Sequence, residues 1–156
     1  VTLVSGYNNL TVVGTSAVVS GLLSGTTYSY RVRAVNASGP SQNSGSQSVL
    51  TVPAAPAALT PTFVTTTGFT ANWSPSAGAS SYLLDVSTTN FSTFVSGYNG
   101  LALTDTDFAV TGLTAGTSYQ YRIRALNASG TSVNSSTVST ITICAPPVAN
   151  AATAIT

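Results

Sequence analysis

The sequence contains no lysine, glutamate, histidine or methionine, and only 4% of its 156 residues are charged. Soluble domains usually contain about 25% Asp, Glu, Lys and Arg. Without histidine or glutamate, and with Cys144 as its single cysteine, the chain has no residues for a zinc site or for a Ser-His-Asp or Cys-His nucleophile system. We therefore expect a protein that is not an enzyme and that has no cofactor-binding or metal-binding residues.

Positive charge and long apolar runs are also scarce. Four arginines and three aspartates give a net charge of +1, which provides no basic field for nucleic-acid phosphates or anionic lipid. We therefore expect no nucleic-acid binding. No run of 18 apolar residues is present, so we expect no membrane insertion either. Serine and threonine together number 49, and a surface solvated by hydroxyl groups instead of charges favours an extracellular or cell-surface location.

Much of the sequence occurs twice, at a spacing of 91 residues. Residues 4–8, 25–34 and 36–39 recur with few changes as 95–99, 116–125 and 127–130. Residues 1–65 align on 92–156 without a gap, and about half of the aligned residues are identical. Such self-similarity predicts a tandem array with one unit every 91 residues, a normal size for a β-sandwich domain.

Proline-containing segments mark the expected unit boundaries. Pro53-Ala-Ala-Pro56 and the matching Cys144-Ala-Pro-Pro147 are typical of linkers, because proline removes a backbone donor and stiffens the chain. We expect one complete unit over 54–143. Residues 1–53 would then be the C-terminal half of a preceding unit, and 144–156 the first strand of a following one.

Short apolar alternations with period two, separated by Gly, Pro, Asn and Ser clusters, indicate strands throughout the complete unit. We expect strands at about 57–64, 68–74, 82–87, a short one opening at Phe94, 106–113, 118–126 and about 137–143. The parity of the alternation points Trp73, Tyr82, Tyr119 and Tyr121 inward. The sequence therefore predicts an all-β fold, a seven-stranded antiparallel sandwich.

The same residues carry a family resemblance. Trp73, Tyr82 and the run Leu113-Thr-Ala-Gly-Thr-Ser-Tyr-Gln-Tyr-Arg-Ile-Arg-Ala-Leu-Asn-Ala-Ser-Gly130 resemble a fibronectin type III domain. The resemblance implies that the phenol of Tyr119 bonds back to the preceding turn as a tyrosine corner. More narrowly, Trp73, the stretch 78–88 and Gly97-Tyr98-Asn99 resemble repeats of very large surface proteins of bacteria that use type IX secretion, where such repeats act as stalks, spacers, filaments or adhesin parts.

The four arginines form one pair in each repeat, predicted to face outward. Arg31, Arg33, Arg122 and Arg124 are candidate interface residues for anionic glycans or for a carboxylate on a neighbouring chain. The alternative, which we favour, is an exposed cross-strand pair with Asp85 contributing about 0–1 kcal/mol. Asp105 and Asp107 resemble half of a calcium site, but two carboxylates are too few, and an ordinary loop is the favoured interpretation.

Cysteine and asparagine supply the remaining candidates. Cys144 replaces Pro53 at a repeat boundary, where it either forms an interchain disulfide or lies half-buried under the linker; we favour the second. Asn-x-Ser/Thr sequons, candidate glycan acceptors, occur at Asn9, Asn36, Asn72, Asn90, Asn127 and Asn134.

These observations favour a structural segment of an extracellular stalk or filament. An adhesive module recognising glycans or cells, and spacer domains of a secreted hydrolase, are the alternatives. Residues 1–53 supply only half a sandwich, with Tyr28 and Tyr30 aimed at a core whose other half is missing. We expect this half not to stay folded alone, and to be completed by the rest of a long polypeptide or by another copy, joined end to end.

Overall fold

The computed structural model describes residues 3–149, and two antiparallel sheets face each other within residues 54–143. The first sheet has the order β5 (Ala58–Thr62), β6 (Phe69–Trp73), β9 (Asp107–Val110). The second has the order β11 (Gly130–Thr131), β10 (Ser118–Asn127), β7 (Ser81–Ser87), β8 (Leu101–Leu103), with β12 (Val138–Ile141) also paired to β10. The described residues contain no helix, so they contain no helix that is long and apolar enough to cross a membrane.

Apolar side chains from both sheets fill the space between them. In β10 every second residue from Tyr119 to Asn127 is buried, as the two-residue period of a strand requires. The core consists of Phe69, Ala71, Trp73, Tyr82, Leu84, Val86, Val110, Leu113, Tyr119, Tyr121, Ile123 and Ala125, each at most 6% exposed. The predicted all-β sandwich is confirmed.

One expected strand is misplaced. No strand begins at Phe94; residues 88–100 form turns, and the strand follows at β8. Asn90 and Phe91 have positive φ angles, as do Gly97 and Gly100, and such backbone cannot continue a pleated strand. The segment is held to β7 only by isolated bonds, including those that join Val86 to Val95 and Tyr98.

The last strand, β12, is shorter than the expected 137–143, and polar side chains on either side of it satisfy backbone groups. The hydroxyls of Ser132 and Ser135 accept the Ala125 and Ile123 amides between β11 and β12, in place of backbone carbonyls. Thr142, just after β12, is only 2% exposed. Its hydroxyl donates to the carbonyl of Thr114 at 2.7 Å, which satisfies the buried oxygen.

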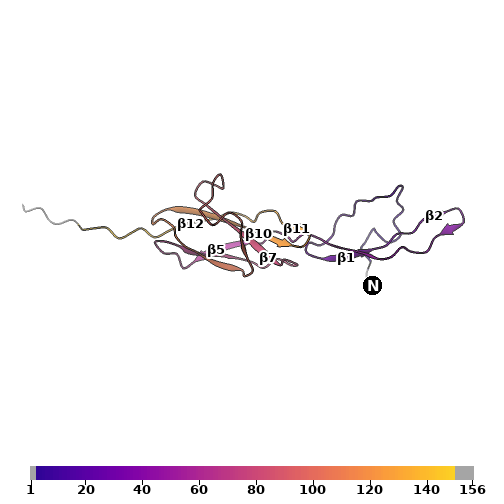
Figure 1. Cartoon of the computed structure of the whole chain (residues 1–156), viewed down its shortest axis with the longest axis horizontal. Coiled ribbons are helices and arrows are strands. Elements are labelled where there is room, and N and C mark those ends of the chain that lie inside the picture. Colours follow the sequence, from indigo (N-terminus) through magenta and orange to yellow (C-terminus); the bar gives the residue numbers. More distant parts are fainter. Residues whose placement is uncertain (1–2, 150–156) are drawn as a thin grey trace, which may run out of the picture.

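Residues 3–53, which we call the N-terminal segment, extend from one end of the sandwich (Figure 1). It contains β1 (Thr27–Tyr30) paired with β4 (Gln47–Leu50), and the short pair β2 (Val35–Asn36) and β3 (Gly39–Pro40). Among the described residues no second sheet covers β1, so Tyr30 is 58% exposed while Tyr28 is half-buried. Neither tyrosine lies in a closed core.

Candidate functional site

The first candidate cluster is a buried carboxylate on the outer face of the second sheet. Asp85 of β7 is 1% exposed, and its Oδ2 accepts a hydrogen bond from Arg122 Nε at 2.9 Å. Its Oδ1 accepts from Arg124 Nη2 at 3.1 Å and from the Gly100 amide at 2.8 Å. The expected pairing of Asp85 with these arginines is present.

The expectation that this pair is exposed is wrong, because the segment 88–100 folds over it. The hydroxyl of Ser87 accepts the Thr89 and Phe91 amides at 2.9 and 3.0 Å, which anchors the segment to β7. The Phe91 ring then lies 4.0 Å from the guanidinium carbon of Arg122, in a cation–π contact. No periodic pattern in the sequence predicts this cover.

This arrangement separates the two arginine pairs. Arg122 and Arg124 are only 23% and 29% exposed, and both point at Asp85. Arg31 and Arg33 are exposed, and Arg33 Nη2 donates to Asn9 Oδ1 at 2.5 Å. Of the two pairs, the N-terminal one is therefore the more accessible to a partner, and its interface role stays a prediction.

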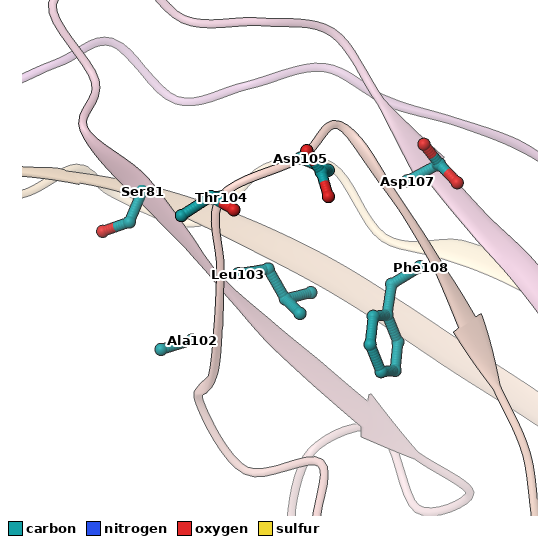
Figure 2. Close-up of a pocket in the computed structure, with 7 residues that line it drawn as sticks. All are labelled: Ser81, Ala102, Leu103, Thr104, Asp105, Asp107 and Phe108. Atoms are coloured by element: carbon teal, nitrogen blue, oxygen red, sulfur yellow. The ribbon is translucent and has the colours of Figure 1, made fainter.

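A shallow open groove of about 320 Å³ lies between β8 and β9 (Figure 2). Figure 2 shows Asp105 on the connecting loop and Asp107 at the start of β9, both exposed. The remaining lining residues are Ser81, Ala102, Leu103, Thr104 and Phe108. No third acidic, histidine or cysteine side chain joins the two carboxylates anywhere in residues 3–149, so the groove lacks the ligand set of a calcium site.

The second candidate is the contact between the N-terminal segment and the sandwich, which we call the junction. The last residue of β10 and the turn after it supply two of its hydrogen bonds. Asn127 Nδ2 donates to the Thr51 carbonyl at 2.9 Å, and Ser129 Oγ donates to the Leu50 carbonyl at 2.5 Å. Within the 54–143 unit, Ser76 Oγ donates to the Ala54 carbonyl at 2.7 Å, which holds the first residue after the N-terminal segment.

Two glycines allow the backbones at the junction to touch. Gly25 and Gly78 both have positive φ angles, of 59° and 69°. A Cβ on Gly78 would lie 2.2 Å from the Gly25 carbonyl oxygen, and one on Gly25 would lie 1.9 Å from the Ala77 carbonyl oxygen. Only glycine fits either position. The linker residues Pro53 and Pro56 are both buried.

The junction bears directly on the sequons. Asn127 is 7% exposed, so a glycan on its amide is incompatible with the junction, and the acceptor prediction for this residue is wrong. The side-chain nitrogen Nδ2 of Asn72 donates to the Thr60 and Thr70 carbonyls and to the Thr62 hydroxyl. The other sequon asparagines, Asn9, Asn36, Asn90 and Asn134, are exposed and remain predicted acceptors.

Several local bonds recur at the 91-residue spacing of the sequence. The Tyr119 phenol accepts the Thr114 amide at 3.0 Å, which is the bond expected of a tyrosine corner, and the Tyr28 phenol accepts the Leu23 amide at 2.9 Å. The matching serine pairs Ser132/Ser135 and Ser41/Ser44 accept the amides of Ala125, Ile123, Ala34 and Val32. The N-terminal segment therefore repeats local structure of the sandwich without having its core.

Cys144 lies beyond the last strand, at the end of the sandwich opposite the junction. It is exposed, so the expected burial under the linker is wrong: residues 145–149 do not cover it. Gly116 lies beside it: a Cβ added to Gly116 would lie 3.5 Å from the Cys144 sulfur. The interchain disulfide stays a prediction.

A sandwich of two antiparallel sheets, with a tyrosine corner and a core tryptophan, defines the class of immunoglobulin-like β-sandwich domains. Within that class, the family model described as "Fibronectin type III domain" matches residues 54–142, so the chain belongs to the fibronectin type III family. A fibronectin type III domain is a non-catalytic module, which agrees with the prediction that these residues are not an enzyme.

Individual proteins extend this comparison. The chain is 35% identical over 148 residues to Chitinase A1 of Niallia circulans; the match covers 81% of this chain but only 20% of that protein. The structure resembles domains A168–A170 of titin, with a TM-score of 0.52, 24% identity and 64% of this chain covered, against 36% of that one. It also resembles a β-1,2-glucanase from Parabacteroides distasonis, with a TM-score of 0.51 and 16% identity over 61% of this chain and 13% of that one. The two structural likenesses show the fold alone.

Proposed function

We propose that this chain is a structural spacer segment of an extracellular bacterial protein, in which fibronectin type III units follow one another end to end. The proposed units are 1–53 as the later half of one domain, 54–143 as a complete domain, and 144–156 as the start of another. The match to Chitinase A1 supports this division, because it extends beyond the residues that the family model matches.

The observation that carries the proposal is the closed junction. A flexible linker would leave Pro53 and Pro56 in solvent, whereas both are buried. The glycine contact and the Asn127 and Ser129 bonds set the direction in which one unit follows the next. A chain of such units holds whatever it connects at a fixed distance and orientation, which is what a spacer does.

Two settings for the spacer have separate support. A secreted hydrolase is favoured by the chitinase relative, of which this chain spans 20%. A surface stalk or filament is favoured by the 4% charge content, since neighbouring copies then repel each other weakly. Antibodies against the chain separate the two: hydrolase activity co-precipitating from the culture medium supports the first, and signal retained on intact cells supports the second.

A thiol-accessibility experiment tests the junction itself. The Pro53→Cys variant places a thiol in the closed junction, at the position that aligns with the exposed Cys144 in the same chain. We expect an alkylating reagent to modify the introduced thiol at least tenfold more slowly than Cys144, with both rates read by peptide mass spectrometry. Equal rates would contradict the spacer proposal, because the junction would then be open.

A further inference from the structure

We propose that the free end of the sandwich, formed by Gly116, the backbone carbonyl of Thr142, Ile143 and Cys144, is a docking surface for a second copy of the 54–143 unit. That copy would pack on this end as the 54–143 unit packs on the N-terminal segment. The inference rests on the proposed function, and it adds the partner and the residues of a second contact site.

The backbone of the free end has the same conformation and hydrogen bonding as the N-terminal side of the junction, at positions 91 residues later in the sequence. Gly25 and Gly116 have φ angles of 59° and 63°. The Gly25 amide donates to the Val52 carbonyl at 2.9 Å, and the Gly116 amide donates to the Ile143 carbonyl at 3.1 Å. The surface that receives Gly78 at the junction is therefore present at the free end as well.

The side chains beneath this surface are arranged in the same way. The hydroxyl of Thr51 accepts the Thr26 amide at 2.9 Å and donates to the Leu23 carbonyl at 2.7 Å. The hydroxyl of Thr142 accepts the Thr117 amide at 3.0 Å and donates to the carbonyl of Thr114 at 2.7 Å. A docked unit would thus find the Thr142 carbonyl where Asn127 finds that of Thr51.

Among residues 3–149, the difference in exposure between the two ends is seen at the position of Pro53 and Cys144. Pro53 is buried at the junction, whereas Cys144 at the aligned position is exposed. Ile143 is 55% exposed and its counterpart Val52 is 44% exposed, so this pair differs little; a methyl group of Val52 lies 3.4 Å from the position of a Cβ on Gly130. If the Gly130 turn of a docked second copy covered Ile143, apolar surface would be removed from water.

The other half of the contact is carried by the 54–143 unit itself. Gly78, Asn127, Ser129 and Gly130 all lie at its junction end. A second copy of the unit therefore presents every group that the free end requires. For this reason we commit to that copy as the occupant, in preference to a glycan or an unrelated protein.

The test uses the full chain and a longer version of it. Because residues 145–156 align on 54–65, continuing the chain after Thr156 with residues 66–143 builds a second complete unit without adding a cysteine. Cys144 remains the single thiol and reports directly on the contact. We expect thiol alkylation at Cys144 to be at least tenfold slower in the continued chain than in the 156-residue chain.

Matched variants of the appended unit make the result specific. Alanine in place of the glycine corresponding to Gly78 should restore fast alkylation, while alanine in place of the one corresponding to Gly112, which has a similar φ of 74° and open space around it, should not. Fast alkylation of Cys144 in the continued chain, with the Pro53→Cys thiol protected, would overturn this inference and leave the proposed function standing. If both thiols react fast, the proposed function fails as well. Failure of the appended unit to fold, seen in its tryptophan emission, would overturn the 54–143 boundary on which the inference depends.

Discussion

Replacing Asp85 by asparagine removes the charge at the centre of the cluster on the outer face while keeping the shape of the side chain. Asp85 accepts hydrogen bonds from Arg122, Arg124 and the Gly100 amide. An asparagine has one oxygen and an NH₂ group, so one arginine would face a donor instead of an acceptor. Two guanidinium groups would then be left without a counter-charge beneath the 88–100 segment.

The magnitude follows from how deeply each partner is buried. Removing one partner of a fully buried ion pair costs about 3–5 kcal/mol. Arg122 and Arg124 are 23% and 29% exposed, so water screens part of the loss, and we expect about 2–3 kcal/mol. For a domain of this size each kcal/mol lowers Tm by about 4–8 °C, which predicts a fall of about 10–20 °C.

Thermal unfolding followed by circular dichroism measures this change. Asp105→Asn is the matched control, because it is the same substitution at an exposed position and should change the stability by no more than about 0.5 kcal/mol. At 0.5 M NaCl the Debye length is about 4 Å, so salt screens the interactions of exposed ion pairs. Because the Asp85 carboxylate is buried, the difference in stability between the two variants should persist at this salt concentration. An Asp85→Asn protein that melts within about 2 °C of the parent would refute the reasoning.

Three further predictions concern the core and the junction. Trp73→Ala should lower the free energy of unfolding by about 3–5 kcal/mol in urea titrations, since the side chain is 2% exposed between the sheets; a change below 1 kcal/mol would contradict its place in the core. Tyr121→Phe should lose about 1 kcal/mol, because the phenol donates to the Leu59 carbonyl of the facing sheet. Burial raises the pKa of Tyr121 in the folded protein. The neutral phenol therefore stabilises the fold fully below the unfolded pKa of about 10, and this contribution is lost as pH rises through the folded pKa. The phenylalanine variant should lack that loss of stability when unfolding is measured between about pH 8 and 11. Gly78→Ala should expose the Pro53→Cys thiol to alkylation while Gly112→Ala leaves it protected, and identical rates would count against the close glycine contact.

The sandwich and most of its core could be predicted from the sequence because the signal is local. In β10 the two-residue alternation places Tyr119 and Tyr121 inward, and the structure buries both. The family resemblance added the tyrosine corner, whose bond to the Thr114 amide is present. Strand period and turn chemistry act over a few residues, so a single sequence contains them.

The buried charge cluster and the junction depend on contacts that no local pattern encodes. The cover over Asp85 requires positive φ at two consecutive residues, Asn90 and Phe91. Asparagine adopts this backbone more readily than most residues, but phenylalanine gives no such signal in the sequence. Gly25 and Gly78 meet only after the sandwich has formed. Asn127 was predicted as a glycan acceptor because its sequon is visible in the sequence, whereas its bond to the Thr51 carbonyl is not.

Hydrogen exchange of two side-chain amides tests most directly whether the junction is closed. Asn36 and Asn127 occupy matching positions, and each accepts the amide of the serine two residues later at 2.9 Å. They differ in that Asn127 is buried with Nδ2 bonded to the Thr51 carbonyl, while Asn36 is exposed. In the full chain, NMR should show the Asn127 NH₂ protons exchanging at least tenfold more slowly than those of Asn36. Equal exchange rates would mean that the junction is open, and would contradict the spacer account.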